Sequence, residues 1–370
     1  MKPKLRFKNF NNEWEEIELR NIASEIAYGM NSASKEYDGE NKYIRITDID
    51  ENSNRYSNKD VVSPDGILED RFLVKENDIL FARTGASTGK TYLYNSNDGK
   101  LYYAGFLIKA SIINHNSNFI FQQTKLNKYN NWIKIMSMRS GQPGINSQEY
   151  GSYRFSITNI DEENKVSNFL SLIDKKIELQ SKKIEDLKLF KKGLISKLLN
   201  GYDYENMKIK DVLNFEQPTK YIVDSDEYIN DDKAIPVLTA NKAFILGYCN
   251  EKNYYDKGDS IIFDDFTMDM KYTNFNYKIK SSAIKILTAK ENHDLKFLYE
   301  LLLSLNLTSE EHKRHYISTV QEMNVKIPNI EIQKNISSKL NLIDNKILLE
   351  ENFFNNLIKL KKGLMQNMFV

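Results

Sequence analysis

The chain has 370 residues, of which 41% are hydrophobic and 28% charged, and these proportions are typical of a globular protein with more than one domain. We find no secretory signal and no apolar run of about 18 residues, and Cys249 is the only cysteine, so we expect a cytoplasmic protein without disulfides. The formal net charge is +1, which does not favour a uniformly basic nucleic-acid-binding surface.

Strand and helix patterns occur in the same order in residues 1–160 and 202–330. The first segment has β-rich runs at 43–49, 78–83, 91–94 and 106–113, and then a helical pattern at 118–138. The second has β-rich runs at 235–239, 244–248, 260–263 and 282–287, and then a helical pattern at 294–304. Each segment is therefore expected to form a mixed α/β domain.

Residues 167–200 and 337–370 are two copies of one amphipathic segment. They align without a gap at an offset of 170, with 13 identities in 34 positions, and both keep an apolar heptad pattern. A helix of this length spans roughly 50 Å and needs a partner along its seam. We expect the two copies to pair antiparallel, in which case a polar seam residue need not face its own equivalent. The predicted seam residues are Leu170, Ile173, Ile177, Ile184, Leu187, Leu194, Leu340, Ile343, Ile347, Phe354, Leu357 and Leu364.

These patterns predict an α+β protein with an internal tandem repeat. Two mixed α/β domains would be separated by a pair of long antiparallel coiled-coil helices. The first domain is predicted at 1–160 and the second at 202–330. The helices are predicted at 161–201 and 331–370.

Motifs for catalysis are missing. Thr84-Gly-Ala-Ser-Thr-Gly-Lys-Thr91 resembles a phosphate-binding loop, but Thr84 replaces the first glycine and a strand-like run follows it. The four histidines have no metal-binding spacing, and no Asn-Pro-Pro-Tyr-like motif of an amino-methyltransferase is present. We therefore predict no catalytic residue, metal or cofactor in this chain.

Polar loops next to the strands are the candidates for a binding surface. Arginine and lysine suit guanine edges and phosphates, and glutamine and asparagine suit adenine. In the first domain the candidates for DNA contact are Arg83, Thr84, Lys90, Thr91, Arg139, Gln142 and Asn146. In the second they are Asn241, Lys242, Asp265, Lys271, Tyr272, Arg314 and Tyr316. Structural turns with solvated side chains remain the alternative for every one of these loops.

The order of these elements resembles that of the specificity (S) subunit of type I restriction–modification systems. The resemblance covers essentially the whole chain. It rests on the segments Pro3-Lys-Leu-Arg-Phe7, Glu13-Trp-Glu15 and Phe81-Ala-Arg-Thr-Gly85, and on Lys-Lys-Gly-Leu near both helix ends. Ile261-Ile-Phe-Asp-Asp-Phe-Thr267 also resembles the target-recognition domains of that family.

The resemblance implies a non-catalytic DNA-binding subunit with two target-recognition domains, each recognising one half of a bipartite gapped site. The helices would set the spacing and dock two modification (methyltransferase) subunits, and restriction/translocase subunits would join the complex. S-adenosylmethionine, ATP and Mg²⁺ are then expected only in partner subunits. The alternatives are a coiled-coil adaptor that does not bind DNA, a specificity subunit of an allied methyltransferase system, and a standalone enzyme, which the missing motifs disfavour.

Overall fold

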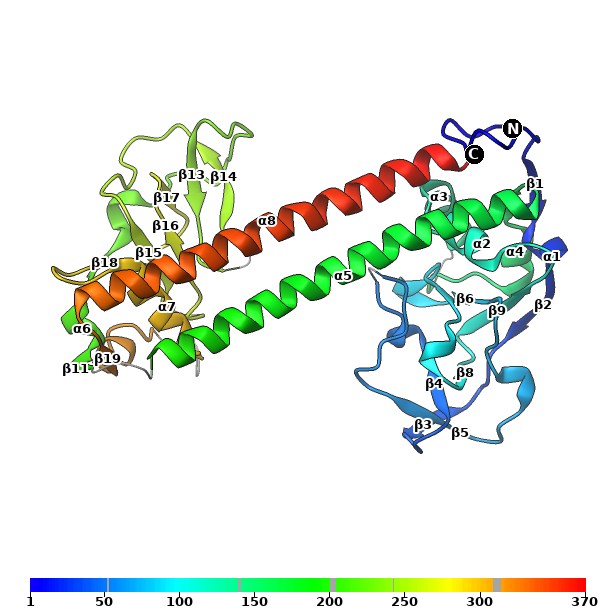
Figure 1. Ribbon diagram of the computed structural model, residues 1–370, viewed down its shortest axis with the longest axis horizontal. Coiled ribbons are helices and arrows are strands. Elements are labelled where there is room, and N and C mark those ends of the chain that lie inside the picture. Colours follow the sequence, from blue (N-terminus) through cyan, green and yellow to red (C-terminus); the bar gives the residue numbers. More distant parts are fainter. Residues whose placement is uncertain (52, 139–140, 200–203, 242, 309–313) are drawn as a thin grey trace. The chain divides into compact units, whose positions relative to one another are not determined.

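The computed structural model describes residues 1–51, 53–138, 141–199, 204–241, 243–308 and 314–370 (Figure 1). The chain divides into two compact units. Unit 1 consists of Met1–Leu179 together with Phe354–Val370, and unit 2 of Gln180–Phe353. Within the described residues, no helix has the length and apolar character needed to cross a bilayer.

Unit 1 begins with a mixed α/β domain. Its strands are β1 (Glu15–Glu18), β2 (Ala23–Tyr28), β3 (Ala33–Glu36), β4 (Lys42–Ile44), β5 (Val62–Asp65), β6 (Asp78–Ala82), β7 (Thr91–Leu93), β8 (Leu101–Tyr103), β9 (Leu107–Ile112) and β10 (Arg154–Ile157). Its helices are α1 (Leu19–Ile22), α2 (Ser117–Gln123), α3 (Asn127–Met136) and α4 (Ser147–Ser152). The long helix α5 (Ile160–Leu199) follows directly.

Unit 2 contains the second mixed α/β domain. Its strands are β11 (Glu205–Lys208), β12 (Leu213–Glu216), β13 (Ile235–Leu238), β14 (Ile245–Cys249), β15 (Ser260–Asp264), β16 (Met270–Thr273), β17 (Lys278–Ile279), β18 (Ile284–Ala289) and β19 (Asn324–Ile327). Its helices are α6 (Ile209–Val212) and α7 (Leu295–Ser304), and α8 (Ile330–Met368) comes last.

The main sheets of the two domains have the same topology. The main antiparallel sheet has the order β2-β9-β6-β7 in unit 1 and β12-β18-β15-β16 in unit 2. A parallel pair, β4-β8 or β13-β17, accompanies each main sheet. The strand that enters each domain pairs with the strand that leads to its long helix, as β1-β10 and β11-β19. The internal repeat predicted from the helices therefore extends to the domains.

Most predicted elements occur close to the expected residues, with two differences. Residues 46–48 of the first β-rich run form a 3-10 turn after β4, because the side chain of Asp48 accepts hydrogen bonds from Arg45. The helical pattern at 118–138 is divided into α2 and α3 by a turn at 124–126. The Thr84–Thr91 segment leads into strand β7, as its sequence indicated.

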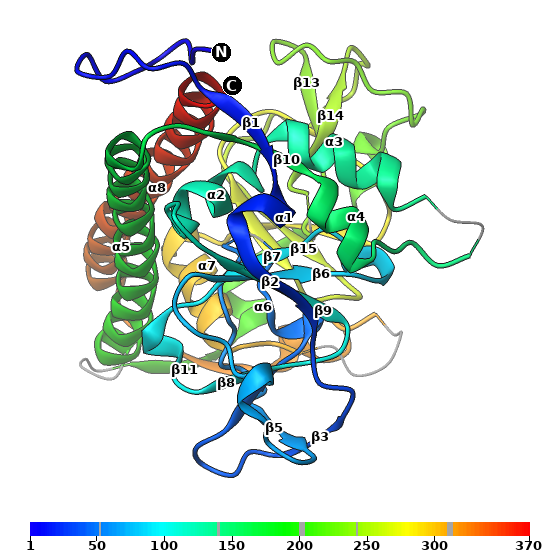
Figure 2. The ribbon, with the colours of Figure 1, turned by 90° about the vertical axis from the view of Figure 1, so that its right-hand side faces the viewer.

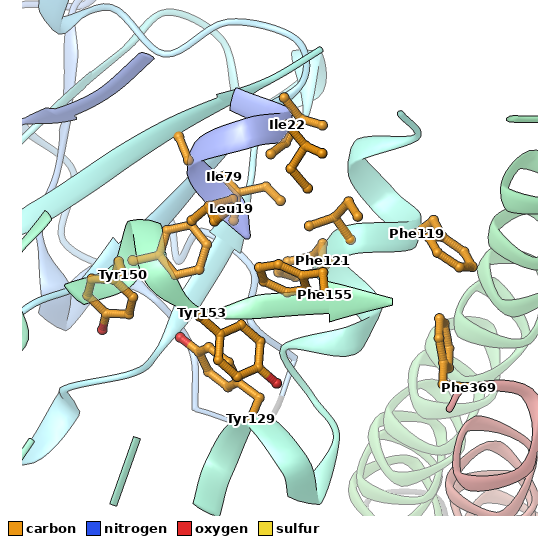
Figure 3. Packing of buried hydrophobic residues seen from close by; sticks show 14 of the residues in the cluster. Leu19, Ile22, Ile79, Phe119, Phe121, Tyr129, Tyr150, Tyr153, Phe155 and Phe369 are labelled. Carbon is orange, nitrogen blue, oxygen red and sulfur yellow. The ribbon is translucent and has the colours of Figure 1, made fainter. Parts of the chain in front are cut away.

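The core of unit 1 includes side chains from the last turn of α8. Met365 and Met368 of this turn are buried there. The next residue, Phe369, packs against Phe119 with ring centroids 5.1 Å apart (Figure 3). It also packs against Trp14, at 6.2 Å. The backbone amide of Leu5 also donates to the carbonyl of Asn367, so the N-terminal segment lies beside the end of α8 (Figure 2). The first domain is thus completed by the last residues of the chain.

Unit 2 is built in the corresponding way. Leu194, Ile195 and Leu198 of α5 pack against its main core, which contains Phe263, Phe297 and Tyr316. In both units the long helix that leaves the domain begins after an asparagine cap. The side chain of Asn159 accepts from the amide of Glu162, and that of Asn329 accepts from the amide of Ile332.

Candidate nucleic-acid interface

The two polar loops predicted in unit 1 lie against each other. The amide of Gly85 donates to the carbonyl of Pro143, and the amide of Ile145 donates to the carbonyl of Arg83, both at 2.9 Å. Thr84 and Gly144 form an isolated β-bridge between the loops. The loop after β6 and the loop before α4, some 60 positions apart in the sequence, therefore lie together. Residues 83–91 and 141–147, with Tyr28 at the end of β2, are called loop cluster 1 below.

Arg83 occupies the centre of loop cluster 1. Its guanidinium carbon lies 4.8 Å from the centroid of the Tyr28 ring, and its Nη1 donates to the carbonyl of Gly105 at 3.4 Å. Its Nε is buried and has no hydrogen-bond partner. Thr84 beside it is half-buried, and Gln142 is exposed. The arginine is held in place while part of its donor capacity stays unused.

Tyr28 is a residue of this cluster that the sequence did not indicate. Its hydroxyl accepts from the amide of Ser147 at 3.1 Å, so it links the end of β2 to the second loop. Burial raises the pKa of Tyr28, but the hydrogen bonds from Ser147 and the charge of Arg83 outweigh it, and the pKa is lowered. The next residue, Gly29, comes so close to the 103–105 turn that an added Cβ would lie 2.2 Å from the carbonyl oxygen of Ala104.

The remaining unit 1 candidates are engaged in other contacts. The ammonium of Lys90 pairs with Glu51 at 2.8 Å. Thr91 is buried, and its hydroxyl lies 2.8 Å from that of Thr124. Asn146 caps α4 by accepting from the amide of Glu149, although the residue is exposed. Arg139 lies outside the described residues.

Asp265 in unit 2 is equivalent to Arg83 but points into the interior. Its carboxylate lies 3.2 Å from the ammonium of Lys285, each side chain is 1% exposed, and it also accepts from the amide of Tyr316. Tyr316 is buried as well, between Phe215 and Phe263. Contrary to what a DNA contact requires, Thr91, Asp265 and Tyr316 are buried, and none of the three side chains reaches the surface.

Arg314 lies at the surface next to these buried residues. Its guanidinium carbon is 5.7 Å from the centroid of the Phe266 ring, and the amide of the next residue, His315, donates to the carbonyl of Asp265 at 3.0 Å. The loop after β15 (265–269) and residues 314–316 thus form loop cluster 2, equivalent to loop cluster 1.

The other unit 2 candidates do not take part in the hydrogen bonds of loop cluster 2 given above. Lys271 is exposed on β16. The hydroxyl of Tyr272 donates to Asp259, and its ring lies under the ammonium of Lys296 at 4.9 Å. Asn241 accepts from the hydroxyl of Thr239. Lys242 lies outside the described residues.

The long helices run antiparallel within each unit. In unit 1, Lys361 pairs with Asp174, while Ser156, just before α5, contacts the carbonyl of Val370. In unit 2, Lys191 pairs with Asp344 at 2.6 Å. Five of the predicted seam residues are buried and the other seven are half-buried; the buried ones are Leu170, Ile184, Leu340, Ile347 and Leu357.

The polar seam residues behave in two ways. Gln180 contacts its own equivalent in the repeat, since its Nε2 donates to Oε2 of Glu350 at 2.7 Å. Lys183 and Lys346 also pair with this carboxylate, and these hydrogen bonds lower the pKa of Glu350 to about 2. Lys191 and Lys361 instead pair with acidic residues of the opposite helix.

Among the residues that the structure describes, no group of histidine, cysteine and carboxylate side chains is arranged to hold a metal ion. What the two loop clusters offer is hydrogen-bond donors on a rigid backbone, which is chemistry for binding.

Comparison with known proteins identifies the class. The family model described as "Type I restriction modification DNA specificity domain" matches residues 11–189 and again 202–359. The crystal structure of the type I restriction–modification S subunit from M. genitalium is similar over 100% of this chain and 99% of that chain. Its TM-score is 0.67 at 15% sequence identity, which supports the fold. A structure from work on the assembly and conformational transition of the type I system matches with a TM-score of 0.56 and 14% identity, covering 96% and 97% of the two chains.

The chain belongs to the family of type I restriction–modification specificity subunits. It is 40% identical over 141 residues to the EcoR124I/EcoR124II specificity subunit of Escherichia coli, a match that covers 36% of this chain and 35% of that protein. It is 24% identical over 350 residues to the MjaVIII specificity subunit of Methanocaldococcus jannaschii, covering 81% and 80% of the two proteins.

Proposed function

We propose that each domain recognises one half of a bipartite, gapped DNA site, as the non-catalytic specificity subunit of a type I complex. The observation that carries the proposal is the duplicated loop cluster. The equivalent strands β6 and β15 lead into loops at the same place in each domain, but the side chains that reach the surface differ: Arg83 and Gln142 in loop cluster 1, and Arg314 in loop cluster 2. Two equivalent sites with different residues are what two different half-sites require.

The long helices would set the distance between the half-sites. They have 40 and 39 residues, and a helix rises about 1.5 Å per residue. Because their seam residues are buried or half-buried, the pair is rigid enough to act as a spacer. Adding seven residues to each helix would lengthen it by about 10 Å, or about three base pairs of B-DNA.

Equivalent apolar side chains are exposed on the helices of both units. In unit 1 they are Leu172, Leu179 and Leu360, and in unit 2 they are Leu342, Leu349 and Phe190, which occupy the same repeat positions. Exposed apolar groups on a helix pair are typical of a protein interface. We propose that each set docks one modification subunit, which gives two copies in the complex.

The partners would supply the chemistry. Modification subunits would bring S-adenosylmethionine-dependent methylation, and restriction/translocase subunits would bring ATP and Mg²⁺, while this chain binds none of these cofactors. We propose a cytoplasmic location, because the double-stranded DNA and the partner subunits are found there.

The spacer proposal is tested by inserting seven residues into both helices at equivalent seam positions and sequencing the methylated sites in cells with the modification subunits. We expect both half-sites to be unchanged and the gap to widen by about three base pairs. A methylated motif with its original gap would contradict the spacer function, and the absence of DNA protection by the complex would favour the adaptor alternative.

Docking is tested by Leu172→Glu and Leu342→Glu. We expect each variant to bind one modification subunit and the double variant none, measured by native mass spectrometry of the reconstituted complex. Lys182→Glu, an exposed charged position of α5, is the matched control and should keep two. Two bound subunits on the double variant would contradict the docking surfaces.

A further inference from the structure

Two arginines differ from the other described arginines because they form no ion pair. The chain has nine arginines, eight of them in the described residues. Six of the eight form ion pairs with carboxylates: Arg6, Arg20, Arg45, Arg55, Arg71 and Arg154. Within the described part of the chain, only Arg83 and Arg314 have no carboxylate at ion-pair distance.

Both of these arginines lie over an aromatic ring. The guanidinium carbon of Arg83 is 4.8 Å from the Tyr28 centroid, and that of Arg314 is 5.7 Å from the Phe266 centroid. A cation over a ring face is attracted by the ring quadrupole, and Arg also stacks on aromatic faces through its planar group. The ring therefore limits the orientations of the guanidinium without itself occupying the N–H groups. In Arg83, Nη1 also donates to the carbonyl of Gly105, which leaves N–H groups of Nη1 and Nη2 for another acceptor.

The two pairs occupy equivalent places in the repeat. Arg83 and Phe266 belong to the loops that follow the equivalent strands β6 and β15. In unit 1 the arginine comes from this loop and the ring from the end of β2. In unit 2 the ring comes from this loop and the arginine from residue 314, which is the only arginine in residues 180–353. Each loop cluster thus contains one arginine held by one ring, although the partners come from different segments.

The backbone around each pair is fixed. The amide of Arg83 donates to the carbonyl of Phe106 at 3.0 Å, and its carbonyl accepts from Ile145. The amide of Asp265, next to Phe266, donates to the carbonyl of Ala283 at 2.9 Å. The amide of His315, next to Arg314, donates to the carbonyl of Asp265 at 3.0 Å. A contact that selects one base needs a side chain held in a defined place, and these hydrogen bonds fix the backbone from which each arginine and each loop ring project.

We propose that Arg83 and Arg314 are specificity-determining residues that each recognise a guanine, Arg83 in one half-site and Arg314 in the other. Two parallel N–H groups of a guanidinium match O6 and N7 of guanine in the major groove. Tyr28 and Phe266 are positioning residues that keep the guanidinium in place. This inference rests on the proposed recognition of a bipartite site and names a base in each half.

The test compares Arg83→Lys and Arg314→Lys in the complete complex with its modification subunits. Lysine keeps the charge but loses the paired N–H groups. We expect each variant to accept other bases at one former guanine position of one half-site, with discrimination reduced roughly tenfold to a hundredfold and the other half-site unchanged. The measurements are the methylated motif in cells and the affinity for duplexes that differ at single positions.

Arg71→Lys is the matched control. Arg71 also lies over a ring, that of Phe72 at 4.7 Å, but it pairs with Glu69 and is outside the loop clusters. We expect the methylated motif and the base discrimination of the Arg71→Lys complex to equal those of the unmodified complex.

The positioning residues are tested by Tyr28→Leu and Phe266→Leu, with Tyr28→Phe and Phe266→Tyr as variants that keep the ring. Loss of the ring should relax the same guanine position as the corresponding Arg→Lys change, and variants with a ring should keep the motif. A stability effect alone would lower methylation at every site without changing the motif.

Two results would overturn the proposal. An unchanged motif in both Arg→Lys variants would show that neither arginine selects a base. Equal weakening on all sequences, with a smaller salt dependence, would assign them to phosphates. Failure of the proposed function is distinguishable, because the unmodified complex would then have no bipartite motif, or both variants would alter the same half-site.

Discussion

In unit 2, the carboxylate of Asp265 and the ammonium of Lys285 lie 3.2 Å apart, with 1% of each side chain exposed. Lys285→Met would leave the carboxylate buried and unpaired, so we expect the free energy of unfolding to fall by about 3–5 kcal/mol. Urea denaturation of the purified chain measures this loss.

The double variant Asp265→Asn/Lys285→Met should recover most of the stability, because asparagine keeps an acceptor for the amide of Tyr316 without the charge. If the single variant were as stable as the unmodified chain, the pair would not be buried in solution.

At the scale of residues, chemistry could be predicted from the sequence but burial could not. Arg83, Gln142 and Arg314 were predicted from their donor groups and lie at the surface or half-buried. Thr91 and Asp265 were chosen by the same criterion, yet their partners, Thr124 and Lys285, come from other segments. Tyr28 has no motif around it and becomes part of the cluster only because β2 ends beside it.

Among the helices, Glu350 makes the pairing sensitive to acid. Its pKa in the folded chain is about 2, against an ordinary value of 4.5, because Gln180, Lys183 and Lys346 donate to its carboxylate. Folding favours the ionised form, so its contribution to stability is complete above pH 4.5 and is lost as the pH falls toward 2.

We expect Glu350→Gln to remove this part of the pH dependence and to lower stability at neutral pH, where the contribution of the ionised carboxylate to the unmodified chain is complete. The measurement is the urea concentration at the midpoint of unfolding at a series of pH values, with the circular dichroism of the helices as the signal. An acid dependence that is identical in the variant would mean that other carboxylates account for it.

The end of α8 is a second element whose contribution can be measured. Phe369 is 6% exposed and packs on Trp14 and Phe119, so Phe369→Ala should lower the stability of unit 1 by about 3–5 kcal/mol. Leu189→Ala removes a comparable apolar group from an exposed position of α5 and should change stability by less than about 0.5 kcal/mol. Equal losses in thermal unfolding would contradict the packing at Phe369.

The heptad made the seam predictable, because a spacing near 3.5 residues is a local pattern that specifies the buried face. The sheet order was not predictable, since β9 pairs with β6 and, across a long stretch of chain, with β2. The turn between α2 and α3 at 124–126 has no glycine or proline to indicate it, which explains the single helix expected there.

For the whole molecule, duplication predicts that the two domains act separately. Replacing residues 205–325 with the equivalent segment of another specificity subunit should change one half of the methylated motif and keep the other half and the gap. Replacing residues 15–157 should have the reciprocal effect. Long-read sequencing of methylated DNA measures both, and a change in both halves from one exchange would contradict separate recognition.

The packing of Met365, Met368 and Phe369 into the first domain also has a consequence for biosynthesis. A ribosome releases residues 15–157 long before residues 354–370, so the nascent first domain waits with an apolar surface uncovered while the second domain is translated. Folding of the first domain is then complete only after residues 354–370 pack against it. We expect a chaperone that shields Trp14 and Phe119 during this interval to raise the yield of folded subunit.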